Sequence, residues 1–425
     1  MVAQMEPSAS SQFFGAGGQL LLKYSPVFFV ALVVSLVATP LFGRLAARLG
    51  VVDRPSGRKL HARQVPYLGG LAMLVGWLTA VVVGAVLFLG EIPGMRGPLI
   101  GIVVGTVIAT AVGLLDDVVD LPPLVKVIGQ LVAALVLLAA GVGAGLVGTS
   151  VPLHALGLDL EPGTIRVASL SVSLFLVIGI CNSANLLDGM DGLCSGVIGI
   201  MVAALLAVSL FLSLRGADLV YDPTRMIISL ALMGVVLGFI PYNFNPASIF
   251  MGDAGSMLLG FNMAALLLLM GDRVPTSRFF WSALVVFGLP AFDTVLAIIR
   301  RVSAGRSPFA PDANHLHHQL IRQGLTVRQA VSLLYLMATL FAIVGLLMVH
   351  IRLRYGMLLL LGIGLGLGQL TVSFRLHRYE LLAGVDGSAL ADLPRDDGDG
   401  ARRSGAGGDG SATSADGRGE SGVAT

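Results

Sequence analysis

Apolar runs of about 20 residues recur along this chain from Tyr24 to Ser373, and no other feature restricts its fold so strongly. A helix needs about 20 apolar residues to cross the hydrocarbon core of a bilayer. Soluble domains do not repeat such runs, and about 25% of their residues are charged. Here only 12% of the 425 residues are charged and 55% are hydrophobic. The chain is therefore predicted to be an all-α integral membrane protein.

Eleven apolar runs can be marked, and each is predicted to form one transmembrane helix. They cover residues 25–48, 68–90, 98–115, 124–147, 168–181, 194–214, 226–241, 255–271, 279–299, 330–350 and 354–373. They are too long and too uniformly apolar for the strands of a membrane barrel, which alternate over about 10 residues. We therefore expect about eleven transmembrane helices.

The distribution of Lys and Arg predicts the orientation, because cytoplasmic loops are enriched in these residues. Eleven crossings place the chain ends on opposite sides, and one side carries 14 basic residues against 8 on the other. The larger set is Arg44, Arg48, Arg54, Arg58, Lys59, Arg63, Lys126, Arg300, Arg301, Arg306, Arg322, Arg328, Arg375 and Arg378. The smaller set is Arg96, Arg166, Arg215, Arg225, Arg273, Arg278, Arg352 and Arg354. We predict an outer N-terminus and a cytoplasmic C-terminus in the plasma membrane.

Composition divides the chain into three regions. Residues 1–24 are a polar N-terminal segment, and residues 25–375 hold the membrane helices with their loops. Residues 386–425 are rich in Gly, Ser, Ala, Asp and Arg and nearly lack large apolar side chains. Such a segment cannot bury enough apolar surface to offset chain entropy, so we expect a disordered cytoplasmic tail.

Five polar clusters all fall on the predicted cytoplasmic side, and the outer loops have no comparable cluster. They are residues 53–70, 115–130, 182–192, 243–256 and 300–324. Polar and ionisable residues are costly near the membrane interior, so they tend to mark functional sites. These clusters therefore predict one site on the cytoplasmic face.

Asp116 and Asp117 end the third predicted helix. Adjacent carboxylates can bind a divalent cation or supply a general base. The alternative is a solvated helix end, although acids are unfavourable at helix C-termini. We interpret the pair as catalytic.

Asn182, Asn185 and Asp188 recur every three residues, so on a helix they share one face. Their oxygens suit Mg²⁺, and the amides suit a sugar or a base. An Asx-rich turn is the alternative.

Asp253 stands among small residues just before a helix, whose N-terminus favours a phosphate. Asp253 is predicted to hold a metal that bridges to that phosphate, and a plain helix cap is the alternative.

His315, His317 and His318 follow a basic stretch in a long loop. Arg binds phosphate with two hydrogen bonds, and His donates hydrogen bonds or takes up protons. A zinc site is the competing interpretation. In the first loop, Lys59 and His61 are candidate phosphate contacts, and a purely positive-inside anchor is the alternative.

These residues resemble a known family, the polyprenyl-phosphate N-acetylhexosamine-1-phosphate transferases, over nearly all of residues 25–375. Five strings match in the same order: K-x-H-x-x-x-x-P-x-x-G-G at 59–70, L-D-D at 115–117, N-x-x-N-L-L-D-G-x-D-G-L at 182–193, F-M-G-D-A-G-S at 250–256 and H-L-H-H at 315–318. The resemblance implies transfer of a sugar 1-phosphate from a UDP-N-acetylhexosamine to polyprenyl phosphate, with release of UMP.

The resemblance also implies roles for particular residues. Asp116 and Asp117 would activate the lipid phosphate, either as a base or as a nucleophile. Asp253 would be the main Mg²⁺ ligand with Asn185 or Asp188 nearby, and Mn²⁺ could substitute for Mg²⁺. By the same resemblance, His317 and His318 would contact the diphosphate or the uridine, and Lys59 would contact a phosphate. The remaining predicted substrate-binding residues are His61, Asn182, Asp188 and His315.

Leu316 interrupts the histidine run, which favours the UDP-N-acetylglucosamine branch of the family. Two alternatives stay open. One is the muramoyl-pentapeptide branch, which usually has three consecutive histidines. The other is a transporter for a nucleotide sugar or polar solute, whose polar residues would lie near the bilayer midplane. We expect no nucleic-acid partner, and a homodimer stays open.

Overall fold

The computed structural model describes residues 9–53, 64–88, 90, 94, 96–151, 153, 157–215, 222–271, 277–307 and 315–351, together with 355, 358 and 362. The description below concerns the unit that ends at Leu361. Several predictions fall outside the described residues: the phosphate contacts Lys59 and His61, most of the apolar run 354–373, and the tail 386–425.

The described part of the chain is almost entirely helical, which confirms the all-α prediction. Its helices are α1 (Ala9–Leu49), α2 (Gly69–Phe88), α3 (Arg96–Val119), α4 (Pro123–Ala139), α5 (Leu146–Ser150), α6 (Pro162–Leu187), α7 (Leu193–Leu214), α8 (Asp222–Asn243), α9 (Gly252–Gly271), α10 (Arg278–Val286), α11 (Gly288–Ser303), α12 (Leu316–Arg322) and α13 (Val327–Met348). Two short strands, β1 (Val52–Asp53) and β2 (Val65–Pro66), pair antiparallel.

Eight of the described helices are long and apolar enough to cross a membrane, so the protein is a multi-pass membrane protein. The helices α10 and α11 together meet the same test but meet at a bend of 69°. Ten of the eleven predicted runs fall on described helices. The total of eleven crossings and the orientation stay predictions.

Four runs differ from the single helices expected. Run 25–48 belongs to a longer helix, α1, which begins at Ala9. Run 124–147 is interrupted after α4, because Gly141 and Gly143 adopt φ values of 88° and 86°, which a helix cannot accommodate. Run 168–181 belongs to a longer helix, α6, which extends through polar residues at both ends. Run 279–299 is broken into α10 and α11.

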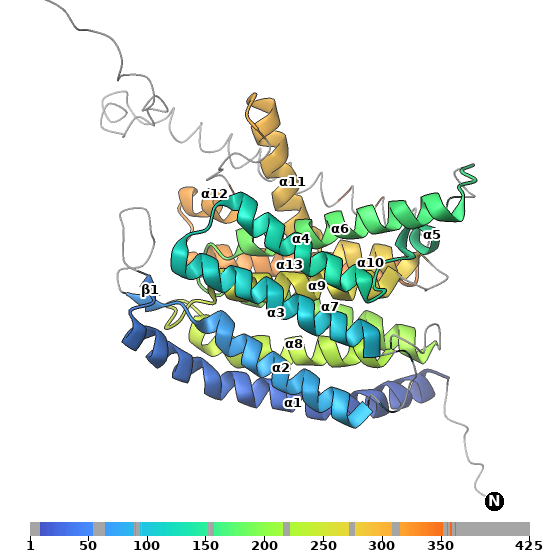
Figure 1. The fold of residues 1–425 in the computed structure, drawn as a ribbon, viewed down its shortest axis with the longest axis horizontal. Coiled ribbons are helices and arrows are strands. Elements are labelled where there is room, and N and C mark those ends of the chain that lie inside the picture. Colours follow the sequence, from blue (N-terminus) through green and yellow to red (C-terminus); the bar gives the residue numbers. More distant parts are fainter. Residues whose placement is uncertain are drawn as a thin grey trace, which may run out of the picture. The chain divides into compact units, whose positions relative to one another are not determined.

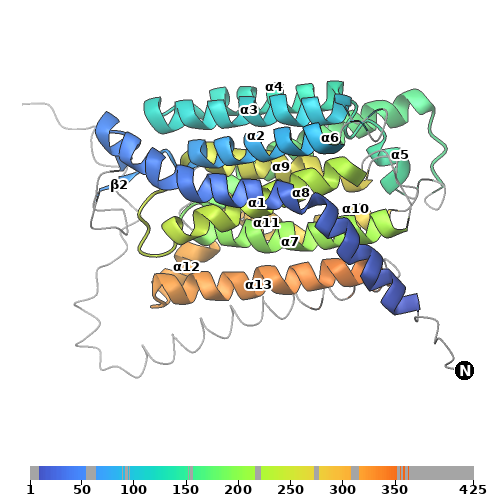
Figure 2. The ribbon, with the colours of Figure 1, turned by 90° about the horizontal axis from the view of Figure 1, so that it is seen from below.

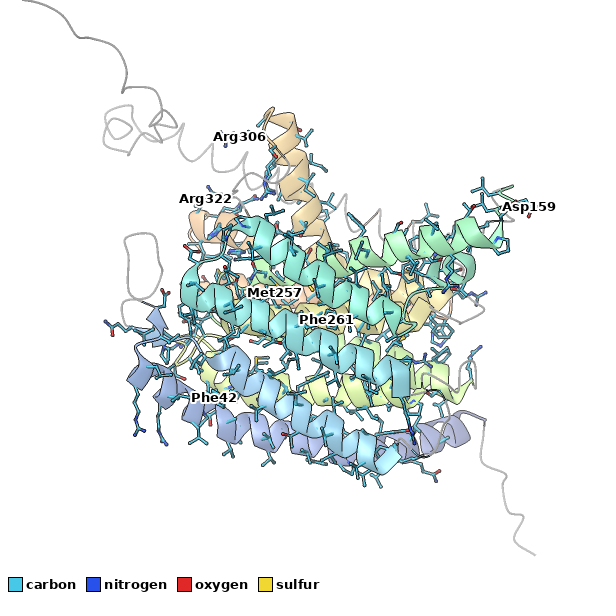
Figure 3. The ribbon with its side chains drawn as sticks, viewed as in Figure 1. Phe42, Asp159, Met257, Phe261, Arg306 and Arg322 are labelled. Atoms are coloured by element: carbon cyan, nitrogen blue, oxygen red, sulfur yellow. The ribbon has the colours of Figure 1, made fainter. Side chains whose placement is uncertain are left out.

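The central helix is α9, whose membrane-spanning window is completely buried. It contacts α2, α3, α6, α7, α8 and α10, and Figures 1 and 2 show these helices running side by side around it. Its side chains Met257 and Phe261 lie inside the bundle (Figure 3). Small residues allow the close packing: a Cβ on Gly113 of α3 would run into the backbone of Asp253.

Backbone pairing fixes the loop that precedes α9 at one end of the bundle. The Phe250 N–H donates to Pro66 O at 2.9 Å, and the Gly70 N–H donates to Met251 O at 2.9 Å. Because this loop is tied to the β2–α2 connection, the start of α9 is held beside the start of α2. At the same end α3 finishes and α4 begins.

Candidate active site

Asp117 in the last turn of α3 caps the first turn of α9. Its Oδ1 accepts the N–H of Asp253 at 2.8 Å, and its Oδ2 accepts the N–H of Ala254 at 3.1 Å. This close contact between α3 and α9 requires glycine at position 252. Gly252 has a φ of 66°, and a Cβ added there would run into the Asp117 carboxylate. The sequence predicts a phosphate at this helix end, but Asp117 itself supplies the anion that these two N–H groups bind.

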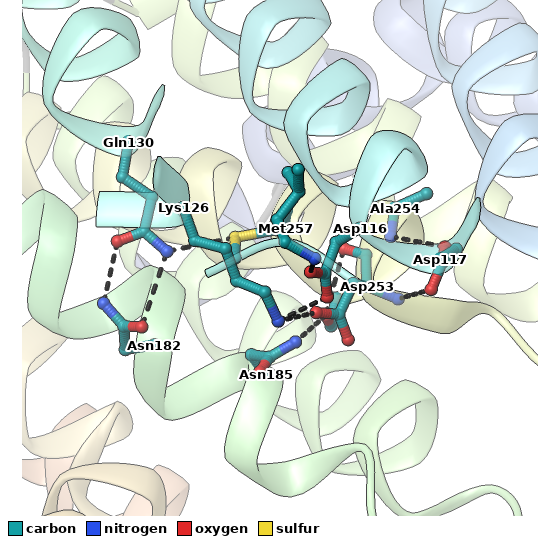
Figure 4. A network of polar contacts seen from close by, with 11 residues as sticks. Asp116, Asp117, Lys126, Gln130, Asn182, Asn185, Asp253, Ala254 and Met257 are labelled. Carbon is teal, nitrogen blue, oxygen red and sulfur yellow. Dashed lines mark hydrogen bonds and ion pairs between the residues drawn. The ribbon is translucent and has the colours of Figure 1, made fainter. Parts of the chain in front are cut away.

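Lys126 in the first turn of α4 bridges two carboxylates from different helices. Its Nζ lies 2.8 Å from Asp253 Oδ2 and also pairs with Asp116 Oδ2. Asp116 is held in turn, because its Oδ1 accepts the Leu121 N–H at 2.8 Å. Figure 4 shows this network. Two acidic motifs that are far apart in the sequence therefore meet around one ammonium group.

The amides of Asn182 and Asn185 lie on the same face of α6, as their spacing predicts. Asn182 Nδ2 donates to Gln130 Oε1 at 2.8 Å, and Asn185 Nδ2 donates to Ser256 Oγ at 3.1 Å (Figure 4). Gln130 follows Lys126 by one turn on α4, so one face of α4 contacts both the acids and the amides. The structure thus joins three of the predicted motifs in one cluster.

The turn between α6 and α7 carries two acids with different surroundings. Asp191 Oδ2 accepts Asn245 Nδ2 at 2.9 Å and the Ala247 N–H at 3.0 Å, which ties this turn to the α8–α9 loop. Burial, and then the nearby carboxylate of Asp253, raise the pKa of Asp188 well above its usual range. Asp188 therefore belongs to the same acidic cluster, where a bound cation would stabilise it.

The histidine motif begins α12 and is anchored by a residue of α11. His315 Nδ1 lies 3.0 Å from Asp293 Oδ2, and the Leu316 N–H donates to Asp293 Oδ1 at 3.0 Å. The rings of His315 and His317 are stacked, with centroids 6.0 Å apart. The His318 ring lies 4.1 Å from that of His317. The three predicted histidines thus form one array.

His317 joins this array to the acidic cluster. Its ring lies against Gly189, the residue after Asp188, where a Cβ would leave no room for it. Burial, and then the charge of His318, lower the pKa of His317 to about 4, so the ring is neutral near pH 7. Among the described residues, its buried Nε2 has no hydrogen-bond partner.

The donor set around Asp253 suits Mg²⁺. Mg²⁺ is usually bound by one or two carboxylates, while water and substrate phosphates fill its other positions. Asp253 and Asp116 already converge on one cationic group, Lys126 Nζ. Rotation of the Asn185 amide by 180° would turn its oxygen toward the same cluster. No group of three or more His, Cys, Asp or Glu side chains in the described ranges is arranged to hold a metal.

Lys126, Gln130 and Asp293 belong to the site but were not among the predicted site residues. Lys126 is one of only three lysines in the chain, and Gln130 is an amide one turn later in an apolar run. Asp293 is an isolated acid inside the run 279–299, which is itself a signal of function in a membrane helix. Each could have been found by asking which polar residues interrupt apolar runs near the predicted cytoplasmic face.

Comparison with known proteins supports the resemblance. The glycosyl transferase family 4 profile matches residues 99–271. The chain is 36% identical over 338 residues to the decaprenyl-phosphate N-acetylglucosaminephosphotransferase of Mycolicibacterium smegmatis. This match covers 75% of this chain and 80% of that protein. It is 35% identical over 325 residues to the probable undecaprenyl-phosphate N-acetylglucosaminyl 1-phosphate transferase of Bacillus subtilis. That match covers 76% of this chain and 84% of the relative.

A more distant relative is the undecaprenyl-phosphate alpha-N-acetylglucosaminyl 1-phosphate transferase of Yersinia pestis, 30% identical over 317 residues, which covers 72% of this chain and 78% of that protein. Every motif cluster from α3 to α9 lies within the matched family profile. The chain therefore belongs to glycosyl transferase family 4, as its sequence motifs predict.

Proposed function

We propose that this protein transfers N-acetylglucosamine 1-phosphate from UDP-N-acetylglucosamine to polyprenyl phosphate and releases UMP. In this reaction an oxygen of the lipid phosphate forms a bond to the β-phosphorus of the donor. The bond between that phosphorus and the oxygen that bridges to the α-phosphate breaks, and UMP leaves. The names of the relatives from Mycolicibacterium smegmatis and Bacillus subtilis support this acceptor and this sugar.

The observation that carries the proposal is the meeting of Asp116, Lys126 and Asp253 at the ends of three helices. Phosphoryl transfer depends mainly on positioning the phosphates and neutralising their charge. Lys126 supplies a positive charge for the phosphates when it leaves the carboxylates. The site lies at helix ends, where a lipid phosphate and a water-soluble nucleotide can both arrive.

Asp116 and Asp117 have different roles in this proposal. Asp117 uses both carboxylate oxygens to fix the start of α9 and thereby Asp253. Asp116 faces Lys126, so it is placed to accept a proton from the lipid phosphate or to act on it directly. Asn182, Asp188 and the histidine array contact the donor, and Lys59 and His61 contact phosphate.

We propose Mg²⁺ as the cofactor, held by Asp253 with Asn185, and Mn²⁺ as a substitute. When bound, the metal would neutralise the donor diphosphate and polarise the phosphorus that is attacked. The protein would contribute to metal binding by positioning Asp253, which the Asp117 cap holds at the start of α9. The location proposed is the plasma membrane with the site facing the cytoplasm, where nucleotide sugars are available.

The transporter alternative receives no support from the position of the polar residues. Transporters bind their substrates near the bilayer midplane, often at broken helices. The acidic and amide cluster instead lies at helix ends, at the last turns of α3 and α6 and the first turns of α4 and α9. Accumulation of labelled nucleotide sugar in vesicles without a lipid acceptor would revive the alternative.

A donor screen on the purified protein tests the proposal. UDP-N-acetylglucosamine and UDP-N-acetylmuramoyl-pentapeptide are each supplied with undecaprenyl or decaprenyl phosphate, and UMP is measured with and without Mg²⁺. We expect UMP only from UDP-N-acetylglucosamine with a lipid acceptor and the metal, and none from Asp253→Asn. Turnover of the pentapeptide donor alone would assign the protein to the muramoyl branch instead.

A further inference from the structure

Asp293 is a buried acid whose described hydrogen bonds all go to the start of the histidine motif. Only 4% of its surface is exposed. A buried carboxylate is costly unless its oxygens accept hydrogen bonds. Its Oδ2 pairs with His315 Nδ1 and its Oδ1 accepts the Leu316 N–H, both at 3.0 Å. The carboxylate therefore links α11 to α12 through two contacts with consecutive residues.

The first contact fixes a ring. A carboxylate that accepts the Nδ1–H of a histidine holds the proton on that nitrogen and turns Nε2 away from the pair. His315 is 4% exposed, so its ring has little freedom apart from this contact. Asp293 thus sets both the orientation and the tautomer of His315.

The second contact fixes a short helix. The helix α12 has seven residues, and its N-cap residue, His315, makes no side-chain hydrogen bond to the helix N–H groups. Asp293 supplies that cap from another helix through Leu316. An isolated helix of this length is unstable in water. The position of His317 and His318 therefore depends on the cap.

The effect reaches the acidic cluster through packed rings. The His315 and His317 rings are nearly parallel, with 6° between their planes. His317 in turn lies against Gly189 in the turn that carries Asp188. A displaced His315 would therefore displace the array relative to the residues proposed to bind the donor.

We propose that Asp293 is a positioning residue of the transferase site, which holds His315 and the start of α12 so that the histidine array faces the donor diphosphate. This inference rests on the proposed function. Asp293 itself touches no substrate and acts through His315. Its loss will therefore affect use of the nucleotide-sugar donor more than use of the lipid acceptor.

The substitution Asp293→Asn separates ring orientation from helix capping. The Asn Oδ1 can still accept the Leu316 N–H, so the cap is kept. Its Nδ2 is a donor, so it pairs with His315 only if the ring proton moves to Nε2. We expect kcat/KM for UDP-N-acetylglucosamine to fall about 10- to 100-fold, the loss typical when the carboxylate behind a metal-bound histidine is removed. The KM for polyprenyl phosphate and the thermal midpoint are expected to stay near wild type.

Two further variants complete the test. His315→Asn keeps an N–H near the position of Nδ1 but removes Nε2, so it loses donor use to a similar degree. In the double variant, Asp293→Asn is expected to add little to His315→Asn, because both act through one ring. The matched control is Thr294→Val on the same helix, which removes the 2.9 Å contact with Ser183 and keeps donor kinetics.

Several results would overturn the proposal. The first is wild-type kinetics in Asp293→Asn. The second is an equal loss of donor and acceptor use in Asp293→Asn together with a lower thermal midpoint. The third is a double variant in which the effects of Asp293→Asn and His315→Asn add independently. If Asp293→Asn cannot be purified, wild-type kinetics in His315→Asn overturn it as well. Absence of UMP release by the wild-type protein would instead refute the proposed function, so the two failures are distinguishable.

Discussion

At the residue scale, the site is organised by aspartates that accept backbone N–H groups from segments remote in the sequence. Asp117 holds the start of α9, Asp191 holds the α8–α9 loop, and Asp293 holds the start of α12. The positions of Asp117 and Asp191 near helix ends could be predicted from the sequence, whereas Asp293 lies inside a run predicted to form a single helix. Their partners could not, because each contact joins segments whose distance is decided only by helix packing.

Lys126 is expected to be essential for turnover although the sequence motifs do not include it. Lys126→Met removes the charge that bridges Asp116 and Asp253, so kcat is expected to fall about 100-fold or more, as when one group that stabilises transition-state charge is lost. The matched control is Lys23→Met, because Lys23 lies against Tyr24 and Phe88. Equal UMP release by both variants would exclude a role for the Lys126 ammonium group.

His317 is expected to make stability depend on pH. Its pKa in the folded protein is about 4, below the ordinary value of about 6.5, so the unfolded chain takes up a proton first as pH falls. The contribution of neutral His317 to the free energy of unfolding is therefore complete above pH 6.5 and is lost as the pH falls from 6.5 to 4. The loss is at most roughly 3 kcal/mol.

The thermal midpoint of the purified protein, measured from pH 7 to pH 4.5, checks this expectation. His317→Gln is expected to show a smaller decline than the wild type. His350→Gln is the control, because His350 packs on Phe211 away from the array. A decline in His317→Gln as steep as in the wild type would contradict the assignment.

At the element scale, most helices could be predicted from apolar runs, and their interruptions could not. The bend between α10 and α11 and the break after α4 lie inside runs that are apolar on average, so mean hydropathy carries no sign of them. Figure 1 shows α11 leaving the direction of its neighbours after this bend. The bend brings Asp293 to the histidine motif, which explains why their pairing could not be anticipated.

Gly252 is expected to be irreplaceable at the junction between α3 and α9. Gly252→Ala puts a side chain at a φ of 66°, which costs roughly 1–2 kcal/mol, and it also displaces the Asp117 carboxylate. The matched control is Gly50→Ala, at a φ of 73° with open space around it. We expect Gly50→Ala to lower only the thermal midpoint and Gly252→Ala to abolish UMP release as well. Equal activity of the two variants would show that the Asp117 cap is dispensable.

At the scale of the whole molecule, one end of the helix bundle carries the described polar network, and its opposite end carries the loops that the sequence predicts to face outward. The sequence predicts this asymmetry from five motif clusters and from the excess of basic residues on one side. The fold class follows from hydropathy alone. The sidedness relative to the cytoplasm depends on the count of crossings, and part of the chain that decides this count lies beyond the described residues.

Two variants that each add one cysteine test the sidedness. Asp159 before α6 and Ala304 after α11 are both exposed. Figure 3 labels Asp159 and also Arg306, which follows Ala304 by two residues. In intact cells we expect a membrane-impermeant maleimide to label Asp159→Cys, and to label Ala304→Cys only after permeabilisation. The native Cys181 and Cys194 are buried and give a low background. The reverse labelling pattern would invert the predicted orientation.

The central claim is that a sugar phosphate, and not the sugar alone, passes to the lipid. It is tested most directly with UDP-N-acetylglucosamine labelled with ³²P in the β-phosphate, supplied with polyprenyl phosphate and the purified protein. We predict that the label moves into the lipid phase and that the nucleotide released is unlabelled UMP, with no transfer by Asp253→Asn. Label retained in the water phase as UDP, with an unlabelled sugar lipid, would contradict the account.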